Sequence, residues 1–204
     1  MVIISSRDYW FTCVDTVVLL DEELSKSAKI VFAVLCEQAG IGSRICNYEV
    51  DPVADILCIK PHVVSKAFEE LEARGVIEHF TEEYIYLVGH NAPCYDIQRC
   101  IMNKIVKTLK YDQYFWFAKV DAAVLRDKEL SPTARLVFAV LCTFADKDKR
   151  GCWPSNDTVA DAAGVSERTV IRAYKELEAR GVITREWNVA RRSGFSSLRW
   201  PAGG

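Results

Sequence analysis

The sequence has few of the residues on which enzyme active sites and metal centres usually depend. It contains three histidines in 204 residues, His62, His79 and His90, and none stands at a spacing typical of a metal ligand set. Its eight cysteines include no closely spaced CxxC pair. There is also no Ser-His-Asp arrangement, phosphate-binding P-loop or nucleotide-binding glycine pattern. We therefore expect a protein that is not an enzyme and that uses neither a metal nor a cofactor.

Long apolar segments are also missing. The longest uninterrupted apolar run is about seven residues, far below the roughly 20 that a membrane-spanning helix needs. The opening residues MVIISSRDYW lack the basic region and the apolar stretch of a signal peptide. These absences predict a cytoplasmic protein with reduced thiols. Cys36 and Cys142, which end apolar helical stretches, are expected to be buried in the core.

What the chain does contain is an internal repeat. Residues 11–77 align with residues 117–183 at a constant offset of 106 without a gap, and 33 of the 67 aligned pairs are identical. The segment IVFAVLC at residues 30–36 recurs as LVFAVLC, and ELEARGVI at residues 70–77 recurs unchanged. The repeat predicts two related domains, each large enough for a small core.

The two copies differ in charge. Residues 1–106 carry a net charge of −7, whereas residues 107–204 carry +5. Such a contrast indicates different partners for the two halves. The basic second half is the candidate for binding a polyanion.

The second copy has the clearer secondary-structure signals. Apolar residues at helical spacing, with suitable capping residues, predict three helices, at residues 132–145, 156–163 and 167–180. Gly164 fits a tight turn between the second and third helices, and Ser166 fits the N-cap of the third. Polar and apolar residues alternate over residues 184–200, which predicts a β-hairpin.

This second copy resembles a known class of DNA-binding domain. The segment VADAAGVSERTVIRAYKELEARGVI, residues 159–183, resembles the helix-turn-helix of winged-helix proteins. Residues 130–183 as a whole resemble helix-turn-helix domains in the replication and regulatory proteins of bacterial and phage mobile elements. The resemblance implies an α+β fold, mainly helical with small β wings, and double-stranded DNA as the partner, so we expect association with the nucleoid.

The third predicted helix of this copy carries the candidate base-reading residues. The N-terminal half of a recognition helix faces base edges in the major groove. Arg168, Thr169 and Arg172 are therefore the expected base readers, with Lys175 one turn further along. Ser166 is expected to act first as a cap and also to contact phosphate.

Other residues of the second copy are expected to contact the DNA backbone. Those at the start of the second helix suit a phosphate because helix N-termini present free N–H groups; they are Ser155, Asn156 and Thr158. Those in the hairpin lie along the backbone or enter the minor groove; they are Arg185, Arg191, Arg192 and Arg199.

The first copy departs from this pattern. Glu49 replaces Ser155, and the predicted wing at residues 78–84 has three acids and no Lys or Arg. Carboxylates facing phosphate would repel it. Three residues of the first copy still allow a weaker contact with DNA, namely Lys60, His62 and Lys66. The alternative is a domain that serves for packing or for binding a protein partner.

Between the copies, apolar residues recur every four positions from Ile97 to Leu109 and predict an amphipathic helix over residues 93–113. It either docks on its own domains or pairs with a second protomer. We therefore expect tandem winged helix-turn-helix domains at residues 1–92 and 114–204. Transcriptional regulation is the favoured role, and replication initiation by two DNA-gripping domains is an alternative. A structural adaptor resembling the acidic winged-helix subunits of chromosome-condensing complexes is the rival from another class.

Overall fold

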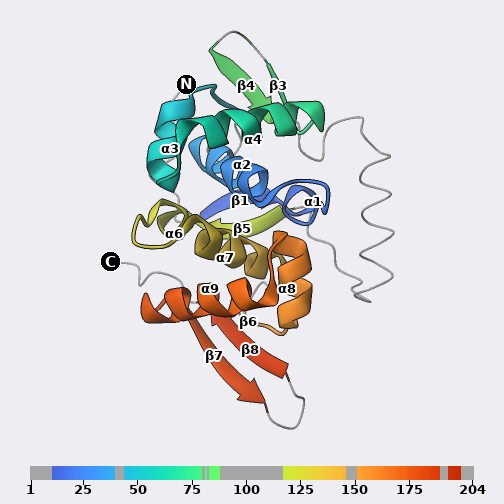
Figure 1. Cartoon of the computed structure of the whole chain (residues 1–204), viewed down its shortest axis with the longest axis vertical. Helices are drawn as coiled ribbons and strands as arrows, with labels where there is room; N and C mark the ends of the chain where they lie inside the picture. Colours follow the sequence, from blue (N-terminus) through green and yellow to red (C-terminus); the bar gives the residue numbers. More distant parts are fainter. Residues whose placement is uncertain are drawn as a thin grey trace, which may run out of the picture.

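The computed structural model describes residues 11–39, 44–79, 81, 83–87, 117–145, 151–188 and 193–198, and these form a mixed α and β fold (Figure 1). The first half contains, in order, β1 (Phe11–Asp15), α1 (Thr16–Leu19), α2 (Lys26–Ala39), β2 (Ile45–Asn47), α3 (Val50–Leu57), α4 (Pro61–Ala73), β3 (Ile77–His79) and β4 (Tyr84–Leu87). The second half repeats this order with β5 (Phe117–Asp121), α6 (Ala122–Arg126), α7 (Pro132–Phe144), β6 (Gly151–Cys152), α8 (Asn156–Ala163), α9 (Glu167–Ala179), β7 (Ile183–Asn188) and β8 (Ser193–Leu198).

The three predicted helices and the hairpin of the second copy are confirmed within one or two residues. Helices α7, α8 and α9 occupy the predicted positions, and β7 pairs antiparallel with β8. The side chains of Ser131, Ser155 and Ser166 each accept a hydrogen bond from a backbone N–H in the first turn of the helix that follows. The predicted linker helix at residues 93–113 lies outside the described residues.

Each half forms its own three-stranded sheet. The strand order is β2-β4-β3 in the first half and β6-β8-β7 in the second. Equivalent polar contacts hold the helices of each half together. Arg74 donates to Asp21 at 2.9 Å, and Arg180 at the equivalent position donates to Asp127 at 2.7 Å. The repeat in sequence is therefore a repeat in structure.

The two halves also share a sheet that the repeat alone did not predict. Strands β1 and β5 pair antiparallel, so that Phe11 lies opposite Asp121, and their counterparts Phe117 and Asp15 pair in the same way. When a residue of one copy pairs with a residue of the other, and the counterparts pair likewise, the copies are related as by a twofold axis. The chain is thus arranged internally like a symmetric dimer.

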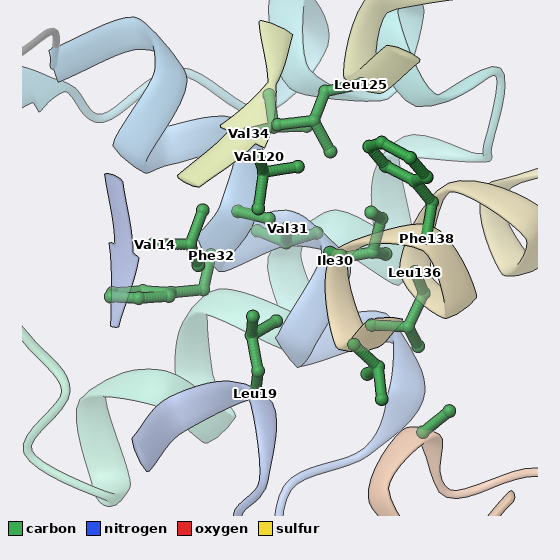
Figure 2. Close-up of a cluster of buried hydrophobic side chains, with 14 of the residues drawn as sticks. Val14, Leu19, Ile30, Val31, Phe32, Val34, Val120, Leu125, Leu136 and Phe138 are labelled. Carbon is green, nitrogen blue, oxygen red and sulfur yellow. The ribbon is translucent and has the colours of Figure 1, made fainter. Parts of the chain in front are cut away.

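The apolar core continues across this pseudo-twofold. Figure 2 shows a cluster of buried apolar side chains to which both halves contribute, with Val14, Ile30 and Val31 from the first half and Val120 and Leu136 from the second. Helix α2 packs on α7 as well as on α4, and α7 packs on α9. Helices α4 and α9 consequently lie toward opposite ends of the long axis, with α2, β1, β5 and α7 between them (Figure 1).

Candidate nucleic-acid interface

The turn between α8 and α9 is tight and well defined. Gly164 takes the left-handed conformation with φ of +64°, which glycine adopts without the steric cost that a Cβ brings. The N–H of Val165 then donates to the carbonyl of Ala160 at 3.0 Å and closes the end of α8. Ser166 begins α9 directly afterwards. Two short helices joined by such a turn constitute a helix-turn-helix.

Helix α9 has one buried and one exposed face. Val170, Ala173, Tyr174 and Leu177 are buried, and α9 packs on α7. The exposed face carries positive side chains at positions one turn apart, namely Arg168, Arg172 and Lys175. Packing on α7 holds the helix in place, and these three cations are presented to solvent.

At the start of each of the two helices, a serine hydroxyl pairs with a threonine hydroxyl three residues later. The Oγ of Ser166 lies 2.9 Å from Oγ1 of Thr169 and accepts a hydrogen bond from the Thr169 N–H. Ser155 and Thr158 repeat the arrangement at the start of α8, with 2.8 Å between their hydroxyl oxygens. Both serines act as caps, which was predicted for Ser166, whereas Ser155 was expected to contact phosphate. Thr169 is half-buried, so it is less available to a ligand than the arginines beside it.

Arg185 of β7 stacks on a buried ring of α9. Its guanidinium carbon lies 4.0 Å from the ring centroid of Tyr174, a cation–π geometry. Its Nε is buried and has no hydrogen-bond partner among the described residues. Burial raises the pKa of Tyr174 to about 12, so the hydroxyl stays neutral beneath the cation. Arg185 therefore joins the hairpin to α9.

The remaining predicted residues of the second copy fall into two groups. Asn156 is half-buried in the first turn of α8. The other three, Arg191, Arg192 and Arg199, lie outside the described residues.

Two apolar side chains near the predicted contacts were not singled out as contacts from the sequence. Ile171 of α9 is 42% exposed between Arg168 and Arg172, and Trp153, just before α8, is 51% exposed. Exposed apolar groups beside base readers suit contact with a thymine methyl or a sugar. A break in the apolar periodicity at position 171 was the signal available for Ile171.

The first half presents a similar but chemically different surface. Lys60, His62 and Lys66 are all exposed at the start of α4. Glu49 and Lys60, at the N-caps of α3 and α4, make no side-chain capping hydrogen bond. The equivalent serines of the second half do cap their helices.

Acidic groups surround these cations of the first half. They are exposed on α3, on α4 and around the β3–β4 hairpin, and they include Asp51, Asp55, Glu69, Glu78 and Glu83. At close range they oppose the attraction of phosphate by the cations. Asp51 and Asp55 have exposed counterparts on α8, Asp157 and Asp161, so the charge difference between the two surfaces comes from positions such as Glu69, where the second half has Lys175.

Neither a metal centre nor a membrane segment is found in the described part of the chain. No group of three or more His, Cys, Asp or Glu side chains is arranged to hold a metal ion there. None of the described helices has the length and apolarity needed to cross a bilayer.

Comparison with known families finds a match within the second half. A family model described as a helix-turn-helix domain matches residues 128–183, which run from just before α7 to the first residue of β7. No curated protein matches the chain. Together with the capped helices, the left-handed Gly164 turn and the exposed cations of α9, this match supports a helix-turn-helix domain at residues 128–183, and such a domain suggests DNA as a partner.

Proposed function

We propose that the chain is a tandem winged helix-turn-helix protein that binds double-stranded DNA sequence-specifically through its second half and regulates transcription in a bacterial or mobile-element system. The observation that carries the proposal is the exposed face of α9. It holds Arg168, Arg172 and Lys175 along one side of a helix whose other side is buried.

In this proposal each element has a distinct task. The guanidinium groups of Arg168 and Arg172 read base edges, because an arginine pairs bidentately with guanine in the major groove. Lys175 neutralises a phosphate further along the groove. The N-terminus of α8, with Ser155 and Thr158, faces the backbone, since its free N–H groups favour an anion. The hairpin β7–β8 serves as the wing beside the helix, attached to it by the stacked Arg185.

The first half supports this reader rather than duplicating it. Its equivalent helix carries Lys60, His62 and Lys66 among exposed acids, a mixture that attracts phosphate weakly. Its large contact with the second half, through β1–β5 and α2–α7, gives it a structural task. An acidic exposed end also suits a protein partner that carries basic groups.

The test begins with selection of bound duplexes from random DNA, followed by affinity measurements on the enriched site. Arg168→Ala combined with Arg172→Ala should weaken specific binding at least about 30-fold, since each bidentate arginine contributes about 1–3 kcal/mol of base discrimination. The matched control is His62→Ala with Lys66→Ala, the equivalent positions of the first half, which should change affinity less than about threefold. Equal losses in both double variants would mean that both halves read DNA. Unchanged affinity in the α9 variant would refute the assignment of that helix.

A further inference from the structure

Two fully buried cationic side chains, at equivalent positions of the repeat, each donate a hydrogen bond to a backbone carbonyl of the other half. Lys29 on α2 and Arg135 on α7 are both 0% exposed. The Nζ of Lys29 donates to the carbonyl of Ala162 in α8, and Nη1 of Arg135 donates at 2.7 Å to the carbonyl of Ile56 in α3. Lys29 corresponds to Arg135, and Ile56 corresponds to Ala162. The two contacts therefore obey the same pseudo-twofold as the β1–β5 ladder.

The acceptor in each case lies in the last turn of a short helix. Carbonyls there have no intrahelical partner and form the negative end of the helix dipole, so a cation is favoured beside them. Ala162 is followed by one more helical residue and then by Gly164, where the chain turns toward α9. A hydrogen bond to Ala162 thus holds the end of α8 at the point that sets the direction of α9.

The geometry points to Lys29 as a positioning residue for the helix-turn-helix of the other half: it fixes the end of α8 and the following turn, so that the DNA-binding unit includes part of the first half. The DNA-binding aspect of this inference rests on the proposed function. Lys29 lies outside the matched segment 128–183 and, being fully buried, cannot itself contact DNA.

Arg135 has hydrogen-bond acceptors in its own half as well as in the other half. Arg135 also donates to the carbonyls of Leu125 and Leu130 within its own half, at 3.1 and 3.0 Å. Its position therefore depends on its own half as well. An ammonium buried without an acceptor is strongly unfavourable, so Lys29 keeps its contact with Ala162 wherever the halves are packed together.

The experiment uses the full chain with three substitutions. Lys29→Met removes the donor, Lys29→Arg keeps a cation, and Phe68→Leu serves as the stability control because Phe68 is buried in the first half against Tyr48. Two quantities are measured in each variant under conditions where it is folded. They are the dissociation constant for the selected DNA site, and the hydrogen-exchange protection of the Gly164 and Val165 amides.

Lys29→Met should raise the dissociation constant about tenfold, which is about 1.4 kcal/mol and matches one hydrogen bond to a charged group. Protection of the Gly164 and Val165 amides should fall by a similar factor. The Ile59 amide, which closes the equivalent turn of the first half by donating to Ala54, should keep its protection. Lys29→Arg should recover most of both losses, and Phe68→Leu should change neither by more than about twofold.

The opposite results are equally clear. If Lys29→Met changes DNA affinity and turn protection no more than Phe68→Leu does, Lys29 is only a stability residue and the inference is overturned. If Lys29→Met does not fold, Lys29→Gln, whose side chain is shorter and uncharged, takes its place with the same expected losses. If the wild-type chain enriches no DNA, the proposed function fails, and the exchange protection of Gly164 and Val165 alone then decides whether Lys29 positions the turn.

Discussion

Because of Lys29, the free energy of unfolding of the protein should change with pH in the alkaline range. Burial lowers the pKa of Lys29 from its ordinary value of 10.5 to about 8, although the negative charges of Asp21, Glu22 and Glu70 act in the opposite direction. The unfolded chain keeps the ordinary value. Between pH 8 and 10.5 the unfolded chain therefore binds a proton that the folded chain has released.

The sign of the effect follows from this difference in bound protons. Stability rises with pH wherever the unfolded state binds more protons. Below pH 8 the ammonium is charged in both states, and the full cost of burying it opposes folding. The free energy of unfolding therefore increases as the pH rises. This gain in stability is complete above pH 10.5 and is lost as the pH falls through 8. The two pKa values, 10.5 and about 8, set the gain at about 3 kcal/mol.

The assay compares urea unfolding of the wild type and Lys29→Met at several pH values from 7 to 10.5, with the thiols kept reduced. Buried thiols add an opposing trend, because burial raises the pKa of Cys46 to about 12 and the unfolded chain loses thiol protons first. This trend is common to both proteins and cancels in their difference. The free energy of unfolding of the wild type should gain about 3 kcal/mol relative to Lys29→Met over this range. A difference that stays constant with pH would refute the burial of a titrating ammonium at this position.

Three further predictions concern positions outside the buried core. Cys58 takes the left-handed conformation with φ of 53°, like Gly164, so Cys58→Gly should stabilise the chain by about 1 kcal/mol. Gly164→Ala should destabilise it by about the same amount and no more, since a Cβ added at Gly164 meets no neighbour. Shifts of the thermal unfolding midpoint by about 2–4 °C in opposite directions test this pair. Asp127→Asn weakens the partly exposed pair with Arg180 and should lower stability by at most about 1 kcal/mol without changing the affinity for the selected DNA; a large loss of affinity would show that this pair also positions α9. Glu49→Ser should raise non-specific DNA affinity and steepen its salt dependence, and an unchanged salt slope would mean that the first half does not face the phosphates.

The elements of the second half were predictable because local signals determine them. Ser131, Ser155 and Ser166 cap the helices that follow them, and Gly164 takes the left-handed conformation; each requirement is satisfied by residues close in sequence. The same reasoning favoured the exposed cations of α9 over its apolar face, because helical spacing separates the two.

The contact between the halves was not predictable in the same way. Strands β1 and β5 are five residues each, and their partners are more than 100 residues apart in the sequence. Neither copy alone contains the information that its first strand pairs with that of the other. Likewise, the buried positions of Lys29 and Arg135 could not be predicted from the sequence. A single charged residue in an apolar helix is normally expected to be exposed until its acceptor is known. Long-range pairing, rather than local propensity, decided these features.

The internal symmetry explains where the two copies resemble each other and where they differ. Residues 30–36 and 136–142 are nearly identical in sequence, and they belong to the two helices that pack against each other across the pseudo-twofold. A change in one alters the surface that the other must fit, and close packing makes such changes costly. The exposed faces of α4 and α9 have no such mutual constraint, because they lie toward opposite ends of the molecule (Figure 1). One face can therefore carry Arg168, Arg172 and Lys175 while the other carries His62, Lys66 and Glu69 at the equivalent positions, with the shared core unchanged.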